Sequence, residues 1–135
     1  MRKIYLITFL TIALLLVFGF RVNDNKHDSK LVGIWKGFEK DKQIEGVEKH
    51  WIQERFKDGT YIIMFTVLEN CEVKTFTEKG NWWTEKGKFY EVTDGTEDID
   101  SYNYEVVDNL VVQFKSIKLT GEDNTNYEFM DYKID

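Results

Sequence analysis

From Leu31 onward, the chain alternates between short stretches rich in aromatic and β-branched residues and short polar breaks. No segment of about eleven residues or more in this part keeps apolar residues at helical spacing. The pattern therefore predicts strands rather than helices. The nine predicted strands are Leu31–Phe38, Val47–Phe56, Thr60–Leu68, Glu72–Thr77, Asn81–Glu85, Lys88–Thr93, Tyr102–Val107, Leu110–Leu119 and Asn126–Lys133.

Glycine, asparagine and aspartate mark the breaks between these strands, and the whole chain contains no proline. These residues tolerate the positive φ angles of tight hairpins, so we expect turns at 57–59, 78–81, 86–87 and 108–109. Successive hairpins give an antiparallel sheet, and closing that sheet removes its two unpaired edges. The predicted fold class is therefore all-β: an antiparallel up-and-down meander of about eight or nine strands that closes into a small barrel.

Several predicted strands are apolar on both faces. In Thr60–Leu68, Ile63 and Phe65 lie on one face. Ile62 and Met64 lie on the other face of the same strand. A sheet with one solvated face alternates more cleanly. The pattern leaves two interpretations open: another segment or protein covers part of the outer surface, or the outer surface is that of an ordinary small barrel.

The start of the chain forms a separate segment. Two basic residues precede an almost unbroken apolar run over 4–20, which is typical of an export signal. Residues 1–19 are therefore predicted to form a signal or anchor helix. As a cleaved signal peptide, the segment offers small residues at Val17 and Gly19 for a cut before Phe20. As a retained anchor, the run is short against the roughly 20 apolar residues that a spanning helix needs.

This segment predicts three parts: a signal peptide or membrane anchor at 1–19, a polar tether at 20–30 and a β-barrel domain at 31–135. The protein is then extracytoplasmic, in a periplasm or secreted, and contacts a membrane only through residues 4–20 if the signal is retained. The net charge of the whole chain is −6, and loss of Arg2 and Lys3 leaves the rest more acidic. Such a charge argues against nucleic acid and anionic membrane surfaces as partners.

The sequence offers little for a metal, a cofactor or catalysis. Its two histidines, His27 and His50, and its single cysteine, Cys71, fit no zinc spacing. A single cysteine also excludes an internal disulfide. No phosphate-binding loop or nucleophile motif is present, so we expect no cofactor and no catalytic residue.

Three short motifs resemble those of lipocalins and the smaller bacterial lipocalin-like (calycin-type) domains. They are Leu31-Val32-Gly33-Ile34-Trp35, Asp58-Gly59-Thr60-Tyr61 and Gly80-Asn81-Trp82-Trp83. The resemblance implies a barrel closed at one end, with a cavity for a small, largely apolar ligand. It departs from the family pattern in the last predicted strand, which lacks the arginine that packs across the first-strand tryptophan. Lys118 or Lys133 is the candidate replacement for that arginine.

Aromatic residues on the predicted strands supply the candidate site. Gly33 and Trp35 are the predicted structural plug of the barrel, because an indole buries up to about 250 Å². On strand 47–56, His50 shares a face with Glu54, and Trp51 shares the other face with Arg55. The sequence does not decide which face points inward. The predicted ligand-binding residues are Trp51, Arg55, Phe65, Trp83, Tyr104 and Phe114.

Two hypotheses of function follow from these patterns. The first is an exported lipocalin-like protein that binds a small hydrophobic or amphipathic ligand in the barrel, which a cavity of roughly 300 Å³ or more favours. The second is an exported protein–protein interaction module, such as an inhibitor or an envelope-complex subunit, with a filled barrel and no small-molecule ligand. Binding is favoured over enzymatic activity, and the sequence does not identify the ligand or the partner.

Overall fold

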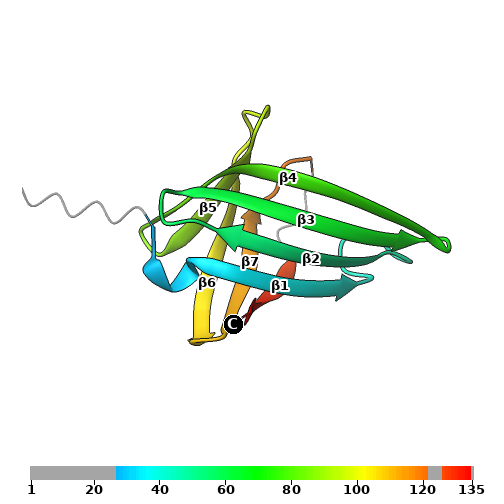
Figure 1. Cartoon of the computed structure of the whole chain (residues 1–135), viewed down its shortest axis with the longest axis horizontal. Helices are drawn as coiled ribbons and strands as arrows, with labels where there is room; N and C mark the ends of the chain where they lie inside the picture. The colour runs from blue at the N-terminus through cyan, green and yellow to red at the C-terminus, as the bar shows by residue number, and fades with distance from the viewer. Residues whose placement is uncertain (1–26, 122–125, 135) are drawn as a thin grey trace, which may run out of the picture.

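The computed structural model describes residues 27–121 and 126–134, which form eight strands preceded by one short 3-10 turn, η1 (Figure 1). The elements in chain order are η1 (Ser29–Leu31), β1 (Gly33–Lys40), β2 (Glu48–Arg55), β3 (Thr60–Glu69), β4 (Glu72–Glu85), β5 (Lys88–Thr93), β6 (Asp100–Asp108), β7 (Val111–Lys118) and β8 (Glu128–Ile134).

The eight strands close into one antiparallel barrel in which every strand pairs with its neighbours in sequence. The first and last strands meet through three paired positions, from Ile34↔Ile134 to Lys36↔Tyr132. This confirms the predicted all-β meander and its closure. The predicted signal or anchor segment, 1–19, lies outside the described residues, as do residues 20–26 of the predicted tether. Within the described part of the chain, no helix has the length and apolar character needed to cross a membrane.

One predicted break is wrong. The expected strands Glu72–Thr77 and Asn81–Glu85 are a single strand, β4, which runs through the expected turn at 78–81. Gly80 is there for close approach rather than for a turn, because a Cβ atom at this position would lie 2.0 Å from the carbonyl oxygen of Val92 on β5. The turns at Gly59 and Gly87 have positive φ angles of 87° and 75°, as hairpin glycines do.

The long hairpin of β3 and β4 extends past its neighbours at the end of the barrel away from η1 (Figure 1). The opposite end is crossed by residues 27–31. There Tyr104 Oη donates to Asp28 at 2.9 Å, and the His27 ring packs edge-on against Trp82. The residues of the predicted tether that the structure describes therefore lie against the barrel.

Trp35 lies fully buried at this crossed end. Its indole Nε1 donates to the carbonyl oxygen of Leu31 at 2.9 Å. Lys133, one of the two lysines proposed to cover this tryptophan, has its Nζ 5.4 Å from the centre of a Trp35 ring. Gly33 has a φ angle of +129°, and a Cβ atom there would lie 3.1 Å from Lys133 Cε. The glycine thus leaves room for the lysine that covers the tryptophan.

Candidate functional site

The barrel contains a partly open cavity of about 180 Å³ whose wall combines aromatic rings with charged groups. Aromatic side chains reach it from β2, β3, β5, β6 and β8, and carboxylates reach it from β4, β5 and β6. The residues that line it are Gln43, Lys49, Trp51, Gln53, Arg55, Tyr61, Ile63, Phe65, Glu78, Phe89, Glu91, Thr93, Asp100, Tyr102, Leu119, Thr120, Tyr127 and Phe129.

A buried ion pair lies beside the cavity. Arg55 Nη2 on β2 donates to Asp131 Oδ2 on β8 at 2.5 Å, and these side chains are 2% and 0% exposed. Trp51 Nε1 donates to the other carboxylate oxygen of Asp131 at 2.8 Å. The Arg55 guanidinium also lies over the rings of Phe89 and Phe114, at 5.2 and 5.1 Å from their centres. The face of β2 that carries Trp51 and Arg55 is therefore the inward one.

Glu91 on β5 presents a carboxyl group to the cavity and is half-buried. Loss of solvation raises its pKa from 4.5 to about 7, because the nearby Arg55 only partly offsets that loss and Asp100 adds to the rise. The Tyr102 hydroxyl hydrogen-bonds to this carboxyl, and burial together with the charge of Glu91 raises the pKa of Tyr102 well above its usual range. A carboxyl with a pKa near 7 both accepts and donates hydrogen bonds at neutral pH.

Lys49 supplies a second positive charge to the cavity wall. Its Nζ lies 3.0 Å from a carboxylate oxygen of Glu39 and donates to Gln43 Oε1 at 2.5 Å. The same ammonium group lies 5.5 Å from the centre of the Phe65 ring, and the Tyr127 hydroxyl donates to Glu39. The positive charge of Lys49 is therefore already balanced by the carboxylate of Glu39.

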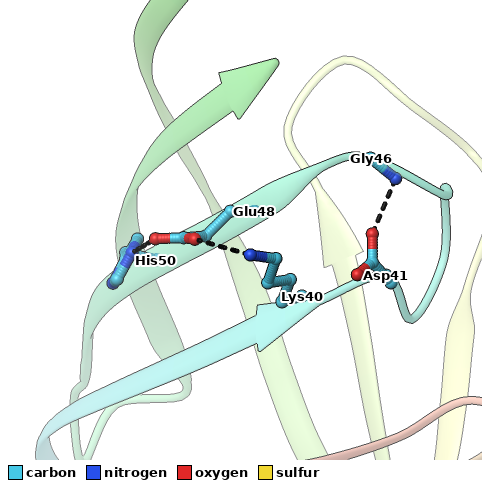
Figure 2. A network of polar contacts seen from close by, with 5 residues as sticks. All are labelled: Lys40, Asp41, Gly46, Glu48 and His50. Atoms are coloured by element: carbon cyan, nitrogen blue, oxygen red, sulfur yellow. Dashed lines mark hydrogen bonds and ion pairs between the residues drawn. The ribbon is translucent and has the colours of Figure 1, made fainter. Parts of the chain in front are cut away.

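The outward face of β2 carries the other predicted pair, His50 and Glu54. Figure 2 shows His50 beside Glu48 on this strand. Glu48 Oε1 lies 2.9 Å from His50 Nε2, and the second oxygen of Glu48 lies 4.0 Å from Lys40 Nζ. His50 is exposed, and neither it nor Glu54 lines the cavity. The two residues therefore cannot act together on a molecule inside the barrel.

The structure brings three of the predicted ligand-binding residues to the cavity wall: Trp51, Arg55 and Phe65. The other three do not line it. Trp83 stacks on Tyr90 with ring centres 5.4 Å apart, on the strand face opposite to the buried Trp82. Phe114 is fully buried against Arg55 and the aromatic core, and Tyr104 lies near the crossed end with its hydroxyl on Asp28.

Sequence reasoning missed Glu91, Tyr102 and Asp131. In β5 the cavity-lining residues Phe89, Glu91 and Thr93 alternate with the intervening positions, so polar groups occupy inward positions. A polar residue in an alternating strand is normally assigned to the solvated face. The signal that could have found Glu91 is the alternation of strand faces. Glu91 lies on the same face as Phe89, which is two residues before it and is buried.

Among the described residues, no three His, Cys, Asp or Glu side chains are grouped so as to hold a metal ion, and Cys71 is exposed in the turn between β3 and β4. No protein-family model matches the chain, and no curated protein matches it. The assignment of the fold therefore rests on the closed eight-stranded barrel alone.

Proposed function

We propose that this chain is an exported, lipocalin-like protein that binds a small amphipathic molecule inside the barrel. The export part rests on the basic and apolar pattern of the first twenty residues. The lipocalin-like part rests on the three sequence motifs, the eight-stranded closed meander and the lysine that covers Trp35. The binding part rests on the cavity.

The observation that carries the proposal is the presence of hydrogen-bonding and charged groups around an internal space. Arg55 and Glu91 both reach the cavity wall from different strands, although burying such groups is costly. A barrel interior that only has to fold is better filled with apolar side chains. Polar groups that converge on a cavity with a perturbed carboxyl pKa are typical of binding sites.

The size and lining of the cavity restrict the ligand. Its volume of about 180 Å³ is smaller than the roughly 300 Å³ at which sites for drug-sized ligands begin. It is slightly larger than an apolar cavity of about 150 Å³ that accommodates benzene. The ligand is therefore about the size of one substituted ring. The mixed polar and aromatic wall of the cavity favours an amphipathic molecule over a purely apolar one.

The test uses two neighbouring isoleucines on β3. Ile63 lines the cavity, whereas Ile62 points outward and is 42% exposed. Ile63→Phe should project a ring into the cavity and obstruct it, at a cost of about 1–3 kcal/mol from overpacking, and Ile62→Phe is the matched control. We expect native mass spectrometry of full-length protein from its own cells to show a small molecule, released on denaturation, with wild type and Ile62→Phe only.

Circular dichroism should first establish that both variants fold. A bare protein mass for wild type, or equal loading of Ile63→Phe and wild type, contradicts binding inside the barrel.

The outer face of the barrel favours a second candidate, an interaction module whose partner protein covers β2 and β3. Ile52 and Met64 are paired across these strands and are 47% and 44% exposed, and Ile62 extends the apolar surface. Contiguous exposed apolar side chains mark interaction sites. A photoreactive residue at position 52 should then crosslink to one defined protein in the source cells, and one at Glu105, exposed on β6, should not. Equal crosslinking from both positions counts against this candidate.

A further inference from the structure

Two nitrogens of the buried Arg55 have no hydrogen-bond acceptor among the described residues. Nη2 is bound to Asp131, whereas Nε and Nη1 are unpaired, although the side chain is only 2% exposed. Leaving a buried donor unpaired costs about 1–3 kcal/mol, so such groups normally have a partner. Because Arg55 lines the cavity, the partner that fits is an acceptor atom of a bound molecule.

Glu91 offers the complementary group from β5. Its carboxyl lies in the same cavity wall and is close enough to Arg55 for their charges to interact, yet no ion pair within 4.0 Å joins the two among the described residues. Two residues of the cavity wall thus carry complementary groups, unpaired donors on Arg55 and a carboxyl group on Glu91, that do not satisfy each other. A ligand that lies between them needs both an acceptor and a donor.

The carboxylates and the unpaired donors of the cavity wall together disfavour a fully charged ligand. The charge of Arg55 is already matched by Asp131, so its free N–H groups need an acceptor rather than an anion. An added anion would lie beside Glu91 and Asp100 in the cavity wall. An added ammonium group would pair with Glu91, but it carries no acceptor, so the two unpaired nitrogens of Arg55 would stay without a partner. A neutral group that carries a carbonyl oxygen and an N–H avoids repulsion by the carboxylates and supplies a partner to both Arg55 and Glu91.

We infer that the cavity binds a molecule with one flat apolar ring and a neutral amide-type head group, such as a carboxamide, lactam or urea. The carbonyl oxygen accepts from Arg55 and the N–H donates to Glu91. The ring contacts the aromatic wall, which includes Trp51, Phe65 and Phe129. This inference rests on the proposed function, because it names the ligand class of the same cavity.

Four probes of nearly equal size test the inference: benzamide, benzoate, benzylamine and ethylbenzene. Each is titrated into the ¹⁵N-labelled full-length protein at pH 8, and binding is read from NMR shifts of cavity groups, above all the Trp51 indole N–H. We expect benzamide to bind at least tenfold more tightly than the other three. Shifts confined to residues on the outer surface count as no cavity binding.

A variant that removes the acceptor sharpens the result. Glu91→Leu should weaken benzamide binding at least tenfold while ethylbenzene binds as well as before or better. Glu105→Leu, at an exposed position on β6, is the matched control and should change neither. Arg55 is left intact because its loss would leave Asp131 buried without its partner.

The outcomes separate the inference from the proposed function. Tighter binding of benzoate, benzylamine or ethylbenzene overturns the amide inference and leaves ligand binding in the barrel standing. So does benzamide binding that Glu91→Leu leaves unchanged. Failure of all four probes to shift any cavity group overturns both the inference and the proposal that the cavity is a binding site.

Discussion

The fold removes the carboxyl group of Glu91 from much of the water that would solvate its charge. Its pKa rises from 4.5 to about 7, mainly through lost solvation. The folded protein therefore binds more protons than the unfolded chain between about pH 4.5 and 7, and stability falls as the pH rises through this range. Glu91→Gln removes that charge. We expect urea unfolding to show a gain on the order of 2 kcal/mol at pH 8 and little gain at pH 5.

The control for this prediction is Glu105→Gln on the exposed face of β6, which should change stability little at either pH. Equal gains for Glu91→Gln at pH 5 and pH 8 would show that the carboxyl is not strained by its charge. The amide would then act through packing or hydrogen bonding alone.

Residue types and alternation predicted part of the site and missed its polar partners. Trp51 and Arg55 were found because a bulky aromatic residue and the only arginine of the predicted domain share one strand face. Asp131 was missed because an aspartate in the last strand looks like a solvated residue until its partner is known. That partner, Arg55, lies on a strand far away in sequence, and only the register of the closed barrel brings the two together.

At the scale of elements, β4 shows how one residue type supports opposite interpretations. The stretch Glu78-Lys79-Gly80-Asn81 has the composition of a hairpin, yet Gly80 pairs with Thr93 inside a continuous strand. Glycine is suited to positive φ and equally to close backbone contact. The sequence cannot separate the two uses, because the contact is made by Val92 on the next strand.

Substitution at two glycines distinguishes these uses. A Cβ atom at Gly80 would lie 2.0 Å from a backbone oxygen, so Gly80→Ala should force β4 and β5 apart and cost about 3 kcal/mol. Gly87, in the turn between the same strands, has a φ of +75° and nothing within 4 Å of a Cβ atom. Gly87→Ala should cost only about 1 kcal/mol. Chemical unfolding measures both, and equal losses would contradict close contact at Gly80.

At the scale of the whole molecule, the meander and its closure follow from the sequence, but the way the barrel is held shut does not. Short apolar stretches with glycine and asparagine turns dictate neighbouring antiparallel strands. The seam between β1 and β8 has three paired positions, whereas β1 and β2 have eight. The pair of Arg55 and Asp131 reaches across this seam, from β2 to β8, and is the feature that sequence patterns could not reveal.

Whether that pair is kept for stability or for function can be decided by a double substitution. Asp131→Asn should cost about 3–5 kcal/mol, because it leaves the Arg55 charge buried without a matching carboxylate. Arg55→Met combined with Asp131→Leu removes both charges and should recover most of that loss, short of the hydrogen bond of Trp51 to Asp131. Urea unfolding measures all three proteins, with Glu128→Gln at the exposed ion pair on β8 as the control. A double variant as stable as wild type would show that an apolar interior closes this barrel equally well, so that the charges serve the cavity. A double variant as unstable as Asp131→Asn would instead show that the ion pair itself is needed to hold the barrel closed.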